Sequence, residues 1–243
     1  MAKDLSKQVE KAVTFYWNTR KQQGKKQGAA TGKKDAGARA AVTGGAQMDG
    51  FIALLSDLIQ DAGVSADHIY HKQSLQLPGF FRPTKEWDLL VVRDGQLILA
   101  LEAKSQVGPS FGNNFNNRTE EAMGSALDLW TAFREGAFNK TVKPWLGYFF
   151  MLEDCLGSQR PVKNREPHFK VFPEFEGASY AKRYELFCRK LMRERHYSAT
   201  AFMTASQDGG MKGQYTEPAE DIRFEMFAKS LLAQCAAYAT GAL

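Results

Sequence analysis

The sequence predicts a single α/β domain, with a mixed central sheet flanked by helices. Three near-continuous apolar segments, 87–92, 96–104 and 145–152, are typical of strands that are buried on both faces. Amphipathic segments with helical spacing alternate with them, and this order favours a sheet covered by helices. At 243 residues, 44% of them hydrophobic, the chain is long enough to bury one substantial core. We therefore expect one domain over residues 1–243.

Composition narrows the class of protein before any motif is considered. Charged residues make up 24% of the chain, and no apolar run approaches the roughly 18 residues that span a bilayer. The chain starts MAKDLSKQVEK, without the apolar core of a signal peptide. Its three cysteines, Cys155, Cys188 and Cys235, are widely spaced and odd in number, which does not suit a disulfide framework. These features predict a cytoplasmic protein with no membrane segment.

Positive charge is concentrated near the N-terminus. The net charge is +5 at pH 7, and residues 1–45 hold ten Lys or Arg against three Asp or Glu. Residues 4–20 have the apolar spacing of a helix. Residues 21–46 are rich in Gly, Ala and Lys, and such a segment cannot bury enough surface to offset its ordering entropy. We predict a flexible basic segment over 21–46, with two compatible roles: a linker, or an arm that becomes ordered on a phosphate backbone.

The remaining elements follow from periodicity and turn residues. An amphipathic helix is expected at 48–62, ended by Gly63. The strands at 87–92 and 96–104 form a hairpin. The passage LPGFFRPTKE before this hairpin is polar and rich in turn residues. The other expected elements are a helix at 119–135, a strand at 145–152, a helix at 180–197, a short strand at 199–205 and a helix at 219–239.

Three polar side chains interrupt the apolar strands: Asp88, Glu102 and Lys104. Ionised groups are costly to bury unless they are paired or bind a metal. Glu102 and Lys104 are two residues apart, so they share one face of their strand. A two-residue turn at Asp94-Gly95 would place Asp88 on the other face. A three-residue turn at 93–95, with Gly95 left-handed, pairs Asp88 with Ala100 and restores a common face, and this is the turn that we predict.

These residue types suit phosphodiester hydrolysis, and their order matches the PD-(D/E)xK pattern of nucleases. Two carboxylates, Asp88 and Glu102, are ligands for a hard cation such as Mg²⁺, which acidifies a bound water and polarises a phosphate. Lys104 can orient or help to deprotonate the attacking water, and it adds positive charge. The alternative interpretation is a structural ion pair at the edge of the sheet.

The next segment, GPSFGNNFNNR, is rich in side chains that recognise bases. Asn suits adenine and Arg suits guanine in the major groove, each through two hydrogen bonds. We therefore expect a DNA-binding loop that opens the helix at 119–135. Its candidate residues are Asn113, Asn114, Asn116, Asn117 and Arg118. The alternative is a turn-rich loop that uses Asn at left-handed positions.

The run EWDLLVVRDGQLILALEAKSQVGPSFGNNFNNR, preceded by GGAQMDGF and LPGFFRP, resembles the XhoI family of type II restriction endonucleases. The resemblance implies a PD-(D/E)xK fold and a Mg²⁺-dependent homodimer that cuts CTCGAG after the first C and leaves 5′ overhangs. It also implies a companion DNA methyltransferase. Asp88 and Glu102 would be the metal ligands and Lys104 the catalytic lysine. The family's general motif has Pro before the Asp, where this chain has Trp87.

Other residues and functions remain beside this interpretation. Asp49, Glu120 and Glu121 are either additional carboxylates of the metal site or ordinary acids in the first turn of a helix. The basic stretch 182–196 either lines a DNA backbone or is a solvated helix face. Two alternative functions stay open. One is a structure-selective repair or recombination nuclease, and the other is a DNA-binding module without catalysis.

Overall fold

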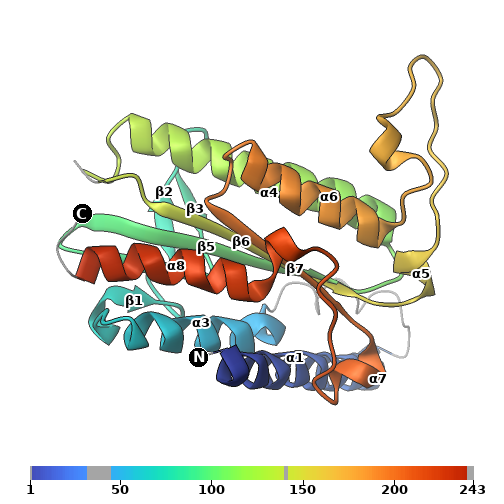
Figure 1. Cartoon of the computed structure of the whole chain (residues 1–243), viewed down its shortest axis with the longest axis horizontal. Helices are drawn as coiled ribbons and strands as arrows, with labels where there is room; N and C mark the ends of the chain where they lie inside the picture. The colour runs from blue at the N-terminus through green and yellow to red at the C-terminus, as the bar shows by residue number, and fades with distance from the viewer. Residues whose placement is uncertain (1, 32–44, 140–141, 240–243) are drawn as a thin grey trace.

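A five-stranded mixed sheet forms the centre of the molecule (Figure 1). The computed structural model describes residues 2–31, 45–139 and 142–239. The strand order is β1-β4-β5-β6-β7, where the first three strands are antiparallel and β5, β6 and β7 are parallel. The strands are β1 (Ile69–Tyr70), β4 (Leu89–Arg93), β5 (Gln96–Gln106), β6 (Trp145–Glu153) and β7 (Ala199–Ala205). The predicted mixed α/β architecture is confirmed.

Helices cover both faces of this sheet. The layer drawn above the sheet in Figure 1 holds α4 (Phe111–Arg134) and α6 (Tyr180–Arg193). The layer below holds α1 (Ala2–Thr31), α3 (Asp49–Asp61) and α8 (Phe224–Ala239). Side chains of one strand alternate between the two cores, so that in β6 Phe149 packs towards α3 and α8 while Phe150 packs towards α6. The near-continuous apolar strands are therefore buried on both faces, as expected.

Short elements connect this framework. They are η1 (Ala46–Met48), η2 (Ala66–His68), β2 (Gln76–Pro78), β3 (Thr84–Glu86), α5 (Leu156–Gln159), η3 (Pro173–Phe175), α7 (Gln207–Gly210) and η4 (Glu220–Ile222). Strands β2 and β3 form a separate two-stranded hairpin within the passage that was expected to be only turns. Among the described residues, no helix is both long and apolar enough to cross a membrane.

The turn between β4 and β5 differs from the prediction. Arg93 lies opposite Gln96, and both Asp94 and Gly95 have positive φ, of 52° and 74°, so the turn has two residues and not three. Asp-Gly favours such a turn because its twist matches that of the flanking strands. A β-bulge then inserts Ile98, since Val92 pairs with Leu97 and Val91 with Leu99.

The bulge compensates for the shorter turn. Leu89 lies opposite Leu101, and continuing this register by one residue sets Asp88 opposite Glu102. The backbone N–H of Asp88 donates to the carbonyl of Leu101 at 3.0 Å. The predicted turn and the predicted Asp88–Ala100 pairing are therefore wrong. The predicted common face of Asp88, Glu102 and Lys104 is still obtained, because the turn and the bulge together shift the register by an even number of residues.

Two helices are longer than predicted. Helix α1 continues to Thr31, past the expected end at residue 20, so it overlaps residues 21–31 of the basic segment expected at 21–46. The flexibility of that segment stays a prediction. Residues 32–44 lie outside the described residues. Helix α4 begins at Phe111 and not near 119, because its first turns pack aromatic rings against α6. The ring centres of Phe111 and Tyr180 are 5.9 Å apart, and those of Phe115 and Tyr184 are 5.0 Å apart.

Candidate active site

Asp88, Glu102 and Lys104 lie together at the junction of β4 and β5. The ammonium Nζ of Lys104 is 3.0 Å from Oε1 of Glu102 and 3.5 Å from Oδ2 of Asp88. The same Oδ2 accepts a hydrogen bond from the backbone N–H of Ala103 at 2.8 Å. The Glu102 side chain is 4% exposed, against 26% for Lys104 and 36% for Asp88. The three residues that the sequence singled out are thus one cluster, with a buried end at Glu102 and an open end at Asp88.

Strand alternation explains why β5 carries this cluster. Leu101 and Ala103 point into the core formed with α3 and α8. Glu102 and Lys104 point to the other face, where their neighbours across β6 are Tyr148 and Phe150. These aromatic side chains leave little water around Glu102. A carboxylate in such surroundings requires partners to remain ionised.

A second lysine, Lys85 of β3, completes the cluster. Its Nζ is 3.1 Å from Oε1 of Glu102 and donates to the carbonyl of Glu86 at 2.9 Å. It also lies 4.2 Å from the centre of the Trp87 ring, and the side chain is only 10% exposed. Sequence reasoning missed Lys85 because the hairpin that carries it was taken as turns. An available signal was the alternation of TKEWD, which places Lys85 and Trp87 on one face of an extended segment.

The charges of the cluster shift its pKa values in opposite directions. Burial raises the pKa of Glu102, but attraction from Lys104 and Lys85 outweighs burial and lowers this pKa below its usual value. Burial disfavours the charged form of Lys104, but Glu102 and Asp88 outweigh it and raise the pKa of Lys104. The pKa of Lys85 is lowered, mainly by burial, and repulsion from Lys104 adds to the effect. Glu102 is therefore held ionised, and Lys104 is held as a cation.

The cluster fits a hard divalent cation. Oε2 of Glu102 is buried, and it has no hydrogen-bond partner among the described residues. A buried, ionised oxygen left unpaired is costly unless a ligand completes it. Within the described ranges, no three His, Cys, Asp or Glu side chains are grouped closely enough to hold a metal by themselves. Two carboxylates suit Mg²⁺, which keeps several waters and often takes its other ligands from a substrate phosphate.

The candidate DNA-binding residues lie on a helix and not on a loop, which corrects the prediction. Asn113, Asn116 and Asn117 are exposed on the first turns of α4, whereas Asn114 and Arg118 are half-buried. None of the four asparagine side chains hydrogen-bonds another described residue. Arg118 forms an ion pair with Glu121, and its positive charge partly offsets the rise in the pKa of Lys104. The start of α4 is therefore close to the cluster of Asp88, Glu102 and Lys104.

The remaining candidate carboxylates differ in their relation to the cluster. Asp49 begins α3, and its pKa is raised, first by burial and also by the negative charge of Asp88, which places it near the open end of the site. Glu120 is exposed and Glu121 pairs with Arg118, so neither contacts Glu102 or Lys104 through a described ion pair. Both lie in the third turn of α4 and not in a first turn, because that helix starts at Phe111.

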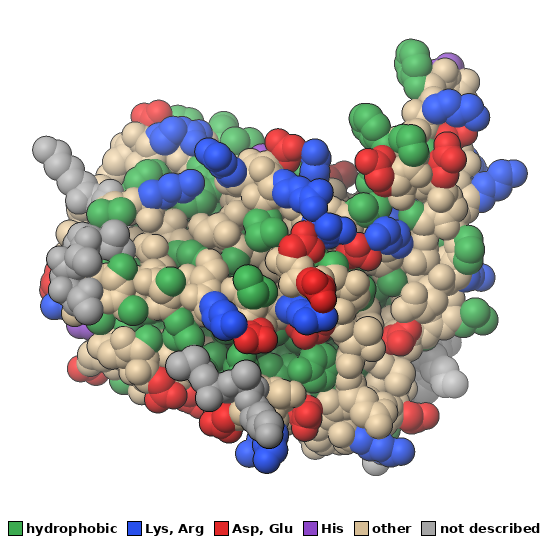
Figure 2. All heavy atoms as spheres, viewed as in Figure 1, with side chains coloured by type: hydrophobic (Ala, Val, Ile, Leu, Met, Phe, Trp, Pro, Cys, Tyr) green, Lys and Arg blue, Asp and Glu red, His purple; other side chains and the backbone are tan. Residues whose placement is uncertain are grey.

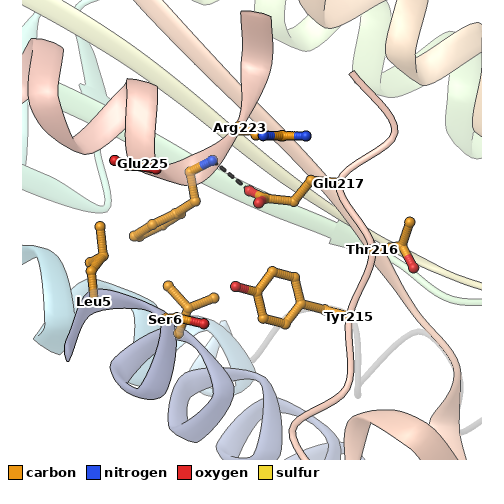
Figure 3. A pocket seen from close by; sticks show the side chains of 9 residues that line it. Leu5, Ser6, Tyr215, Thr216, Glu217, Arg223 and Glu225 are labelled. Carbon is orange, nitrogen blue, oxygen red and sulfur yellow. Dashed lines mark hydrogen bonds between the residues drawn. The ribbon is translucent and has the colours of Figure 1, made fainter. Parts of the chain in front are cut away.

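Two other regions do not form a site of this kind. Figure 2 shows basic side chains of α6 lying among acidic ones, and Lys182, Arg189 and Lys190 each form an ion pair with a carboxylate at 2.7–2.9 Å. This favours a solvated helix face for 182–196. Figure 3 shows a pocket between α1 and the start of α8. There Glu217 accepts a hydrogen bond of 2.6 Å from the backbone N–H of Phe224. Glu217 thus provides a partner for one of the unpaired N–H groups at the N-terminus of α8.

Comparison with known proteins gives consistent matches. The family model described as restriction endonuclease XhoI matches residues 26–217. The type II restriction enzyme BstVI of Geobacillus stearothermophilus is 53% identical over 208 residues, which cover 84% of this chain and 93% of that enzyme. XhoI of Xanthomonas vasicola is 49% identical over 162 residues, 66% of this chain and 65% of that enzyme. AbrI of Azospirillum brasilense is 48% identical over 168 residues, 69% of this chain and 75% of that enzyme. No solved structure matches.

Proposed function

This chain belongs to the restriction endonuclease XhoI family and is a type II restriction endonuclease, and on that premise we propose that it cuts CTCGAG after the first C. The product would carry four-base 5′ overhangs. The family resemblance supports this target, and so does the relative that is named XhoI. Hydrogen-bond chemistry alone does not select the sequence.

One observation carries the assignment of the active site: Lys104 contacts both Asp88 and Glu102, at 3.5 and 3.0 Å. The PD-(D/E)xK pattern combines two carboxylates with a lysine, and here the three side chains lie together on one side of the sheet. A purely structural ion pair would have no need of a second acid. It would also not leave Oε2 of Glu102 buried and unpaired.

We infer that Mg²⁺ is the cofactor, held by Asp88 and Glu102. When bound, such an ion lowers the pKa of a coordinated water and stabilises negative charge on the phosphate. The side chain of Lys104 is 26% exposed, and its ion-pair partners are Asp88 and Glu102. Its ammonium group is therefore placed to orient the attacking water and to balance charge on the phosphate. The aromatic wall around Glu102 excludes water from the inner side of the cluster, which strengthens these electrostatic interactions.

Recognition is assigned to the start of α4, next to the cluster. Its exposed Asn113, Asn116 and Asn117 have free amides for base edges, while Asn114 and Arg118 are half-buried at the same end. A helix N-terminus also favours the phosphates that flank the target. Because CTCGAG is palindromic, the proposal includes a two-fold homodimer with one active site for each strand. A companion DNA methyltransferase would protect the host.

The test is digestion of a plasmid that contains one CTCGAG sequence, in the presence of Mg²⁺, followed by sequencing of the ends. We expect one linear product with 5′-TCGA ends, and no product when EDTA is added or when one base pair of the target is changed. Discrete cutting elsewhere would contradict the target. Random nicking or branch-selective cutting would support a repair or recombination nuclease. Intact DNA at every Mg²⁺ concentration would support a binding module without catalysis.

A further inference from the structure

Lys85 is a largely buried cation whose ammonium group has three close neighbours. These are Oε1 of Glu102 at 3.1 Å, the carbonyl of Glu86 at 2.9 Å and the ring of Trp87, with its centre at 4.2 Å. Lys104 is more open to solvent, with 26% of its side chain exposed against 10% for Lys85. Lys85 is therefore fixed by the protein alone, whereas Lys104 retains access to a ligand.

Both ammonium groups contact the same carboxylate oxygen. Lys85 and Lys104 lie 3.1 and 3.0 Å from Oε1 of Glu102, whereas Oε2 has no partner among the described residues. A carboxylate whose one oxygen is held from two directions can no longer rotate freely about its last torsion. The unpaired oxygen is thereby kept in one orientation. Partners that orient metal ligands in this way are a general requirement of metal sites.

The hairpin that carries Lys85 is anchored at both ends. At its turn, the backbone N–H groups of Phe80 and Phe81 donate to Oδ1 of Asp128 on α4, at 2.7 and 2.8 Å. At its base, the side chain of Trp87 is buried in the core that the sheet forms with α4 and α6. Between these points, Lys85 pairs with Leu77 across the two-stranded sheet. The hairpin is thus held where its lysine reaches Glu102.

Stability alone gives little reason for this lysine. Burying a second cation beside Lys104 costs desolvation and repulsion, and an apolar residue of similar volume is often equally stable or more stable in such a place. We propose that Lys85 is a positioning residue that holds Glu102 in the orientation required for binding Mg²⁺. This inference rests on the proposed function, because it assumes that Glu102 is a metal ligand.

The experiment compares variants in single-turnover cleavage of the plasmid over a series of Mg²⁺ concentrations. Lys85→Met keeps the length of the side chain and removes the charge. We expect it to raise the half-saturating Mg²⁺ concentration about ten- to a hundredfold, with metal-free DNA binding unchanged. Lys85→Arg, which restores a cation, is expected to recover most of the effect. Lys143→Met is the matched control, since Lys143 lies 4.6 Å from the Trp130 ring and has no described carboxylate partner.

The possible outcomes separate the inference from its premise. A Lys85→Met enzyme that melts earlier but retains the wild-type Mg²⁺ dependence would show a merely structural lysine and overturn the inference. A lower half-saturating Mg²⁺ concentration would also overturn it, because the ammonium would then act by repelling the cation. If Lys85→Met does not fold, Lys85→Gln is expected to show a smaller increase, and wild-type dependence would count against the proposal. Glu102→Ala is measured in parallel, and its full activity would refute the proposed site itself.

Discussion

Glu102 and Asp128 are two buried carboxylates that hold the same β2–β3 hairpin, yet their oxygens differ in how many partners they have. Each side chain is 4% exposed. Asp128 accepts the N–H groups of Phe80 and Phe81 on Oδ1, and its Oδ2 lies 2.7 Å from Nε of Arg82. Glu102 receives Lys85 and Lys104 on Oε1 only, and Oε2 has no partner among the described residues.

This difference separates a structural carboxylate from a candidate ligand. For both groups, burial raises the pKa and nearby donors outweigh it, so both pKa values are lowered. Burial and pKa therefore do not tell the two apart. The partners of the two oxygens do: both oxygens of Asp128 accept hydrogen bonds, whereas Oε2 of Glu102 has no partner among the described residues. Substitutions at and around the two carboxylates test this criterion: changes at Glu102 should affect cleavage, and changes at Asp128 should affect stability.

The largest effect is expected at Glu102. Glu102→Gln keeps the shape of the side chain and removes its charge, so the proposed Mg²⁺ site would lose one of its two carboxylates. We expect cleavage to fall by roughly a thousandfold or more, with DNA binding retained. Asp88→Asn, at the more exposed end of the cluster, should behave similarly and is less prone to misfold. Retention of full Mg²⁺-dependent cutting by either variant would end the assignment of metal ligands.

Lys104→Met should give the next largest effect. The variant loses the cation that is placed at the open end of the cluster, and the single-turnover rate at saturating Mg²⁺ is expected to fall about a hundredfold. Binding of the target DNA should change little. A variant with the wild-type rate would mean that Lys104 serves only to balance the charges of Asp88 and Glu102.

Asp128→Asn should affect stability and not chemistry. Removing the charge weakens three donor interactions, and we expect the free energy of unfolding to fall by about 2 kcal/mol. For a chain of this length the melting temperature should decrease by roughly 4–8 °C. The rate at saturating Mg²⁺, corrected for the folded fraction, should change less than tenfold. A loss comparable to that of Glu102→Gln would contradict the criterion of saturated oxygens.

The same variant has an expected pH dependence. Because the pKa of Asp128 is lowered in the folded state, its contribution is fully present above the unfolded pKa of about 4 and is lost as the pH falls through the lower folded value. The difference in stability between the wild type and Asp128→Asn should therefore be constant near neutral pH and shrink below about pH 4. Denaturant titrations at several pH values measure it. A difference that grows at low pH would show that the ionised carboxylate is not the stabilising form.

The smallest effects are expected at the start of α4. There the same question, whether a polar group already has a partner within the protein, is asked of asparagine side-chain amides. Asn116→Ala and Asn117→Ala should leave the melting temperature unchanged and each reduce discrimination against altered targets by about 1 kcal/mol, or roughly fivefold in binding ratio. Asn139→Ala is the control with an internal partner, since its Nδ2 donates to the carbonyl of Gly95 at 3.0 Å. It should lower stability by about 1 kcal/mol and leave discrimination unchanged. The reverse result would move recognition away from the start of α4.

Much of the framework could be read from local patterns. The strand at 199–205 coincides with β7, and the helix at 48–62 differs from α3 by one residue at each end. The apolar runs of β4, β5 and β6 predicted strands buried on both faces because a strand that is covered on both sides requires apolar residues at every position. The two-residue period placed Glu102 and Lys104 on one face without further information.

Only the tertiary structure decided how the site is completed. A bulge at Ile98 compensates for the two-residue turn at Asp94-Gly95 and returns Asp88 to the face of Glu102. Packing of Phe111 and Phe115 against α6 drew an asparagine-rich segment into a helix, against its intrinsic propensity. Lys85 reaches Glu102 because its hairpin is anchored to Asp128, more than forty residues away in the chain. Sequence periodicity records which side of an element is buried, but contacts between distant segments leave no local pattern, and those contacts complete this site.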